Sequence, residues 1–140
     1  MSDSFFLDTN ILVYSFDSTE PAKSSRAKAL IRDALASGKG VVSYQVVQEF
    51  LNVALRRFAR PMTPLEAELY LSITLVPLLA VQSSRSLFAQ ALRLSRDYSV
   101  SWYDSLILAA ALEARCSILY SEDFQHGQKF SDLRVVDPFL

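Results

Sequence analysis

Apolar residues along this chain fall into two kinds of pattern. Short, nearly continuous apolar runs, typical of buried strands, occupy residues 5–7, 41–43, 78–81, 116–121 and 133–136. Elsewhere apolar residues recur at every third or fourth position, as in amphipathic helices, over residues 27–35, 47–58 and 87–92. Strands that alternate with helices predict an α/β fold with one central parallel sheet of four or five strands, flanked by helices.

Capping residues predict where individual helices begin and end. Asn10 is expected to cap a short helix, and Gly38 and Gly40 are expected to end the helix that precedes them. Thr63 starts a capping-box sequence with proline at the first helical position. The helix predicted over residues 102–113 is apolar on nearly every side, which indicates that it lies in the core.

Composition bounds the class of protein. A chain of 140 residues, 51% of them hydrophobic, is near the commonest domain size, so we expect a single domain over residues 1–140. One cysteine, Cys116, excludes an internal disulfide and a cysteine-rich zinc site, and we expect it to be buried. The most apolar stretch, residues 73–81, is too short to span a bilayer, and the N-terminus does not look like a signal peptide. We therefore expect a soluble, cytoplasmic protein with no membrane partner.

Four acidic residues stand at the edges of apolar elements: Asp8, Glu49, Asp104 and Asp123. A buried carboxylate is costly unless it is paired or binds a metal, and no comparable set of buried bases is visible to pair with these four. Asp8 and Asp123 follow predicted strands, Glu49 lies early in a helix after another strand, and Asp104 lies in the first turn of its helix. Because ligand sites of open α/β sheets form beyond the carboxyl ends of the strands, all four can converge there. An all-oxygen cluster suits magnesium or manganese.

Each acid has a simpler explanation when it is taken alone. Asp8 can serve as a helix cap, Glu49 can lie on the solvated side of an amphipathic helix, and Asp104 can interact with its helix dipole. Asp123 has an acidic neighbour, Glu122, that competes for the same role. A functional site is therefore indicated by the four acids together, in this order along the chain, and not by any one of them alone.

These motifs together resemble the PIN-domain nucleases. The run from Phe6 to Leu12, with its Asp8-Thr9-Asn10 centre, is similar to the opening of that family. The family's later motifs match, in order, around Glu49, Asp104 and the sequence Ser121-Glu122-Asp123, where the family's spacing selects Asp123. The resemblance spans the whole chain, and among PIN domains the chain looks most like the VapC-type toxins of bacterial toxin–antitoxin pairs.

The resemblance implies a metal-dependent endoribonuclease. Asp8 and Asp104 would be direct ligands of Mg²⁺ or Mn²⁺, and Glu49 and Asp123 would complete the site directly or through water. Asn10 and Ser121 would orient a ligand or a water molecule, in supporting roles. A VapC-like protein is also expected to form a homodimer and to bind a small antitoxin protein.

Contacts with RNA have to come from local basic clusters, because the net charge of −1 gives no overall attraction to a polyanion. We predict that the concentrated set Arg56, Arg57 and Arg60 contacts RNA. A second basic set, at residues 23–39, is equally well explained as a solvated helix face. Residues 69–81 hold more apolar side chains than one face of a small domain is expected to bury, which predicts an interface there.

Other readings of the acidic residues differ in how well they fit. A haloacid-dehalogenase-like phosphatase would need a second aspartate where Asn10 stands, so that reading fails. A housekeeping RNA-processing PIN nuclease would use the same acids and metal as a toxin. A non-catalytic PIN binding module is the alternative from another class, although it has no reason to keep four mutually repelling carboxylates. Transfer RNA, a ribosomal RNA loop and messenger RNA all remain open as substrates.

Overall fold

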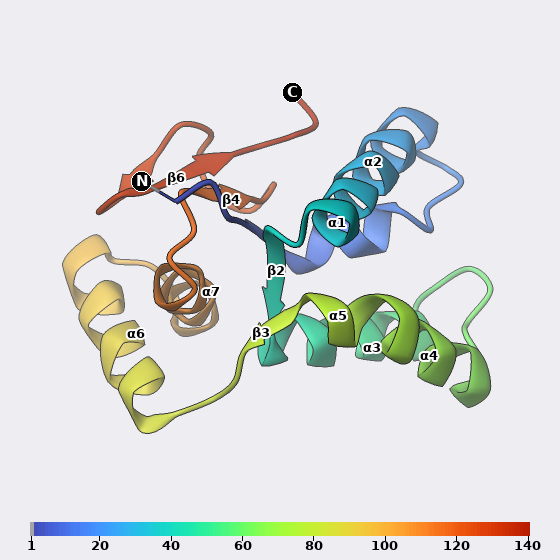
Figure 1. The fold of residues 1–140 in the computed structure, drawn as a ribbon, viewed down its shortest axis with the longest axis horizontal. Coiled ribbons are helices and arrows are strands. Elements are labelled where there is room, and N and C mark those ends of the chain that lie inside the picture. Colours follow the sequence, from blue (N-terminus) through green and yellow to red (C-terminus); the bar gives the residue numbers. More distant parts are fainter. Residues whose placement is uncertain (1) are drawn as a thin grey trace.

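The computed structural model of this chain describes residues 2–140, in which a six-stranded sheet forms the centre of the fold (Figure 1). Its strands are β1 (Phe5–Leu7), β2 (Gly40–Ser43), β3 (Leu79–Val81), β4 (Ile118–Tyr120), β5 (Lys129–Phe130) and β6 (Leu133–Val136). They lie in the order β3-β2-β1-β4-β6-β5, and every neighbouring pair is parallel except β5 with β6. The predicted α/β fold with a mostly parallel sheet is confirmed.

Helices connect the parallel strands and cover the sheet. They are α1 (Thr9–Tyr14), α2 (Pro21–Ser37), α3 (Tyr44–Arg56), α4 (Pro64–Tyr70), α5 (Val76–Leu78), α6 (Arg85–Tyr98) and α7 (Trp102–Glu113), with one π-helical turn, η1 (Leu71–Leu75), between α4 and α5. In Figure 1, α6 and α7 pack together on one side of the sheet, and α2 lies on the other. As predicted, α7 is a core helix, and its residues 105–111 are all buried.

Two of the predicted helix signals act as expected and a third does something else. Thr63 and Glu66 form a complete capping box, in which each side chain accepts a hydrogen bond from the other residue's backbone N–H. Gly38 ends α2 in the left-handed region, at φ 71°. Gly40 does not end a helix but begins β2, where a Cβ atom would lie 2.2 Å from the Cβ of Ala34. Gly40 therefore lets the strand approach α2 closely.

The start of α1 corrects the sequence prediction, because Asp8 caps this helix and Asn10 does not. Asp8 has extended backbone angles, and its Oδ1 accepts a hydrogen bond of 2.7 Å from the backbone N–H of Thr9. Asp8 is the first residue after β1, so the chain passes from strand to helix within one residue. The carboxylate proposed as a ligand thus also serves as a cap.

The edge strand β5 was not predicted from the sequence. It has only two residues, too few to show any periodicity, and it pairs with β6 through a tight turn in which Ser131 has a φ of 58°. Phe130 in this strand is fully buried and packs against the rings of Tyr98 and Phe124. The β5–β6 hairpin therefore closes one end of the core.

The apolar segment at residues 69–81 is buried on one side only. Leu75, Leu78 and Val81 lie in the core, whereas Leu69, Ile73 and Val76 are 54%, 67% and 53% exposed. The latter three, together with Leu65, form an exposed apolar stripe along α4, η1 and α5. The sequence prediction that one chain does not bury this whole segment is confirmed.

Two further expectations concern Cys116 and the membrane. Cys116 is buried in the hydrophobic core, and desolvation raises the pKa of its thiol to about 12, so it remains an inert thiol. Among the helices that the structure describes, none has both the length and the apolar character needed to cross a membrane.

Candidate active site

Asp8 is the most deeply buried of the four acids, with 3% of its surface exposed. Its Oδ1 accepts the Thr9 N–H bond, and its Oδ2 accepts a hydrogen bond of 2.7 Å from the Ser121 hydroxyl. Burial raises the pKa of the Asp8 carboxyl to about 7. The two hydrogen bonds oppose this rise, while the negative charges of Asp123 and Glu49 add to it. Near neutral pH this carboxyl is therefore poised between its two protonation states.

Asp123 is placed beside Asp8 by the pairing of two neighbouring strands. Leu7 of β1 pairs with Tyr120 of β4, so the residues that follow these strands leave the same edge of the sheet. Ser121 is fully buried, and its hydroxyl donates to Asp8 and accepts a hydrogen bond of 3.0 Å from the N–H of Asp123. One hydroxyl therefore fixes the positions of both acids.

The pKa of Asp123 is also raised. Asp123 as a residue is exposed, but desolvation of its carboxyl is the main cause of the rise, and the nearby charges of Asp104, Glu122 and Glu49 add to it. The amide of Asn10 lies close enough to lower this pKa in part, although neither of its polar atoms makes a hydrogen bond of normal geometry.

Glu49 is half-buried in the second turn of α3 and is held from two sides. The Thr9 hydroxyl donates to its Oε1 at 2.6 Å, and Gln45 Nε2 lies 3.4 Å from its Oε2. The same Gln45 nitrogen donates to the carbonyl oxygen of Tyr103 at 3.2 Å. Because Tyr103 precedes Asp104 in α7, Gln45 connects the helix that carries Glu49 to the helix that carries Asp104.

Asp104 is half-buried in the first turn of α7, where the helix dipole favours a negative charge. Its backbone N–H donates to the hydroxyl of Ser101, the N-cap residue, at 3.2 Å. The structure thus gathers all four predicted acids at the carboxyl edge of the sheet, because Asp8 interacts electrostatically with Asp123 and Glu49, and Asp123 interacts with Asp104 and Glu49.

The donor set at this edge fits an oxygen-loving cation. Besides the four carboxylates it contains amide oxygens, and the buried Oδ1 of Asn10 and Oε1 of Gln45 have no hydrogen-bond partner. Such oxygens suit Mg²⁺ or Mn²⁺ and not zinc or copper. Within residues 2–140, no three acidic, histidine or cysteine side chains are already close enough to enclose an ion. The carboxylates would have to draw together around it.

The remaining predicted residues lie farther from this edge. Arg56, Arg57 and Arg60 are all exposed near the end of α3, and Arg57 and Arg60 line a hollow of about 480 Å³ whose walls include Val13 and Val53. Residues 49 and 53 of α3 and its C-cap residue, Arg57, recur every four positions and so share one face. Along this face Arg57 lies about 12 Å from Glu49. Arg56 does not line the hollow. The single histidine, His126, is exposed, and its Nδ1 accepts a hydrogen bond from the N–H of Asp137.

Sequence reasoning named Ser121 but missed Thr9, Gln45 and Ser101, which also hold the acids in place. Thr9 stands inside the Asp8-Thr9-Asn10 motif, next to a candidate ligand, and that position is a usable signal. Ser101 also has a signal, since Ser101-Trp102-Tyr103-Asp104 before an apolar helix is a helix-start sequence, but Gln45 has none, because its role depends on a contact between α3 and α7. The role of Gln45 becomes visible only once the fold is known.

A mostly parallel α/β sheet with four acids converging at its carboxyl edge defines a class of acidic-site domains. The PIN domain family model matches residues 5–129, and this chain belongs to the PIN-domain family. Comparison with curated proteins gives no match.

Solved structures with a similar fold come from several bacteria. A toxin–antitoxin complex from Klebsiella pneumoniae matches with a TM-score of 0.68 and 19% identity, covering 96% of this chain and 98% of that one. Mycobacterium tuberculosis VapC20, a sarcin–ricin loop cleaving toxin, matches with a TM-score of 0.61 and 20% identity, over 86% and 90%. Rickettsia felis VapBC2, bound to a promoter DNA fragment, matches with a TM-score of 0.61 and 15% identity, over 94% and 96%. These similarities are similarities of fold.

Proposed function

We propose that this chain is a metal-dependent endoribonuclease that acts as the toxin of a VapBC-type toxin–antitoxin pair. The observation that carries the proposal is the gathering of Asp8, Glu49, Asp104 and Asp123 at one edge of a PIN-family sheet, with no lysine or arginine in ion-pair contact with any of them among the described residues. The structurally similar VapC20 is described as a sarcin–ricin loop cleaving toxin. We place the protein in the cytoplasm, where such a substrate is found.

Asp8 and Asp104 would hold Mg²⁺ or Mn²⁺, and Glu49 and Asp123 would complete the site directly or through water. A cation bound there would lower the pKa of a water molecule and neutralise charge on the leaving oxygen. Asp8 contributes a carboxylate whose orientation is fixed by Thr9 and Ser121.

The supporting residues have different roles in this proposal. The Ser121 hydroxyl is already engaged by Asp8 and Asp123, so its role is to position these acids. The Asn10 amide is buried without a partner, which leaves it free to hydrogen-bond a water molecule or a phosphate oxygen of the substrate.

A bound RNA strand would extend from the acids along the face of α3 to Arg57 and Arg60 at the hollow. Arg56, which lies outside it, would contribute at most a more distant charge. We expect Arg57→Ala to weaken RNA binding and to reduce the salt slope of the binding constant by about one unit. An unchanged salt slope would show that this basic set faces away from the substrate.

Two protein partners belong to the proposal. A small antitoxin would restrain the nuclease, and an arginine on it would pair bidentately with the acids. A second copy of the chain would cover the exposed stripe of Leu65, Leu69, Ile73 and Val76. Light scattering should then report a dimer at micromolar concentration and a monomer for Ile73→Lys; a monomeric wild type would disprove the homodimer.

The catalytic part of the proposal is tested with purified protein. RNA should be cut in the presence of Mg²⁺ or Mn²⁺ and left intact with EDTA, and Asp8→Asn or Asp104→Asn should lower the rate by about 100-fold or more. Full activity in either variant would refute the assignment of the site. Inactivity of the wild type under all these conditions would favour a non-catalytic PIN module.

The toxin and the housekeeping nuclease are separated by expressing the chain alone in a bacterium. Growth arrest that needs Asp8, and that a small neighbouring gene relieves, supports the toxin. Harmless expression of soluble, active enzyme supports a housekeeping role in RNA processing.

A further inference from the structure

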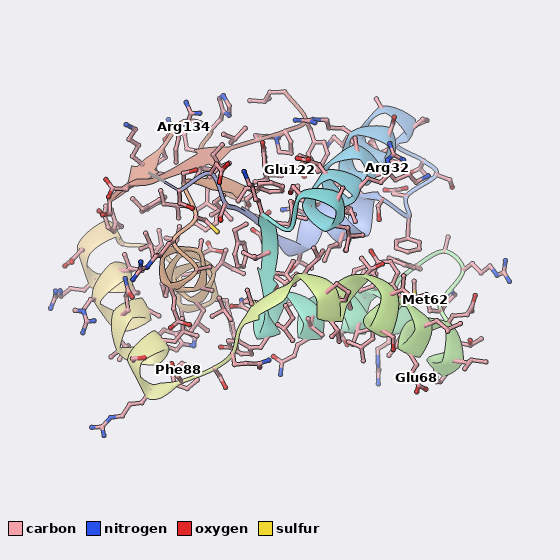
Figure 2. All side chains as sticks on the ribbon, viewed as in Figure 1. Arg32, Met62, Glu68, Phe88, Glu122 and Arg134 are labelled. Carbon is pink, nitrogen blue, oxygen red and sulfur yellow. The ribbon has the colours of Figure 1, made fainter. Side chains whose placement is uncertain are left out.

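The turn after β4 consists of Ser121, Glu122 and Asp123, and hydrogen bonds hold it on two opposite sides. Ser121 and Asp123 face the acidic edge, where the Ser121 hydroxyl bonds both Asp8 and the backbone of Asp123. Glu122 faces the other way, toward α1 and α2 (Figure 2). The Tyr14 hydroxyl donates to Glu122 Oε1 at 2.7 Å, and Lys23 Nζ donates to Glu122 Oε2 at 2.7 Å.

These contacts close a ring around the short helix α1. Asp8 caps the start of this six-residue helix and is bonded to Ser121, while Tyr14 is its last residue and is bonded to Glu122. The turn is therefore tied to both ends of the same helix. Movement of the turn relative to Asp8 requires one of these hydrogen bonds to break.

Lys23 completes the arrangement by neutralising Glu122. It lies in the first turn of α2, about one-third exposed, and also donates to the Tyr14 hydroxyl at 3.2 Å. Its ammonium group lies 4.7 Å from the centre of the Tyr14 ring and 5.5 Å from that of Phe139, and these two rings pack edge to face. A cation held by a carboxylate and two aromatic rings is fixed more firmly than an ordinary surface lysine.

We propose that Tyr14, Lys23 and Glu122 form a clamp that positions the Asp123 carboxylate against Asp8 and withholds the Glu122 carboxylate from the acidic edge. This role rests on the proposed nuclease function, in which Asp123 helps to hold the cation. The three are positioning residues, since their side chains bond one another on the far side of the turn. The clamp also explains in physical terms why Asp123 and not its acidic neighbour is available at the site.

The experiment uses the full chain with Tyr14→Phe, which removes one oxygen atom, and Lys23→Met, which keeps the length of the side chain. Arg96→Gln, which breaks a surface ion pair on α6, is the matched control. Amide hydrogen exchange at Asp123 should become about tenfold faster in both clamp variants and should not change in the control. Mn²⁺ affinity measured by calorimetry should fall about tenfold, as for other residues that orient metal ligands.

The kinetic consequence is a fall in kcat with little change in KM, because the clamp acts on the acids and not on the RNA. Lys23→Arg, which keeps the positive charge, should retain most of the wild-type kcat and Mn²⁺ affinity. Unchanged exchange at Asp123 in both clamp variants would overturn the proposal, and so would unchanged Mn²⁺ affinity together with faster exchange. If Tyr14→Phe does not fold, Glu122→Gln takes its place.

A failure of the proposed function gives a different result from a failure of the clamp. A wild type that neither binds Mn²⁺ nor cuts RNA would refute the nuclease, while the exchange measurement would still decide whether Tyr14, Lys23 and Glu122 hold the turn.

Discussion

Two groups of acidic residues in this protein differ in whether a basic side chain lies beside them. Across the described residues the ion pairs are Lys39 with Asp3, Arg96 with Asp97, and Lys23 with Glu122. The hydrogen bond from the basic partner holds the pKa of Asp3 and of Asp97 below its usual value. Burial alone would raise the pKa of Glu122, but the bonds from Lys23 and Tyr14 outweigh it.

The acidic edge shows the opposite behaviour. Burial and mutual repulsion raise the pKa values of Asp8 and Asp123, and no basic side chain forms an ion pair with either among the residues described. The three paired acids lie at or near the surface, where pairing contributes little, whereas Asp8, for which burial is most costly, has no basic partner among the described residues. Perturbed groups of this kind cluster at functional sites, where stability is given up for activity.

The largest expected effect is a gain in stability from Asp8→Asn without divalent cations. Because the native pKa of about 7 exceeds the ordinary 3.8, the native state binds the proton more tightly, so wild-type stability falls as pH rises from about 4 to 7. At pH 8 the shift of about three units corresponds to roughly 4 kcal/mol, which the neutral asparagine avoids. Urea unfolding at pH 8 should therefore show Asp8→Asn to be the more stable protein by several kcal/mol.

The same comparison at pH 4 is the control for that result. Asp8 is then protonated in the native state, so the advantage of the asparagine should nearly vanish. A variant that is less stable than the wild type at both pH values would mean that the Thr9 and Ser121 hydrogen bonds outweigh the cost of burial.

The second expected effect is a gain in stability when a divalent cation binds Asp8 in place of a proton. Mn²⁺ at about 100 times its dissociation constant should stabilise the wild type by about 2.7 kcal/mol at pH 8. At pH 5 the gain should be much smaller, since a proton occupies Asp8 and competes with the ion. Thermal unfolding with Mn²⁺ or EDTA at both pH values measures this, and Asp104→Asn should remove most of the gain at pH 8. Equal stabilisation at both pH values would place the ion away from Asp8.

The positions of the acids at this edge could be predicted from the sequence, but the hydrogen bonds that hold them could not. Asp8 directly follows one apolar run, Asp123 follows another after Ser121 and Glu122, and Asp104 opens an apolar helix, so the pattern of apolar residues places them without any knowledge of contacts. The bonds that hold them join residues far apart in the chain: Thr9 with Glu49, Gln45 with Tyr103, and Lys23 with Glu122. Such pairs have no local signal, and the two-residue strand β5 is too short to have one.

The smallest expected effect comes from Asp97→Asn, the same chemical change as Asp8→Asn but in a surface ion pair. Asp97 and its partner Arg96 are more than half exposed, so solvent and salt screen their interaction. The pH dependence of its contribution to stability also has the opposite sign. The Arg96 hydrogen bond lowers the pKa of Asp97, so the small stabilisation by Asp97 is present above the ordinary pKa and is lost as pH falls. The melting temperature of Asp97→Asn should equal that of the wild type at pH 8 within error, with or without Mn²⁺. If Asp97→Asn stabilises the protein as much as Asp8→Asn does, the gain comes from lowering the overall negative charge. The effect of Asp8→Asn would then not be specific to the acidic edge.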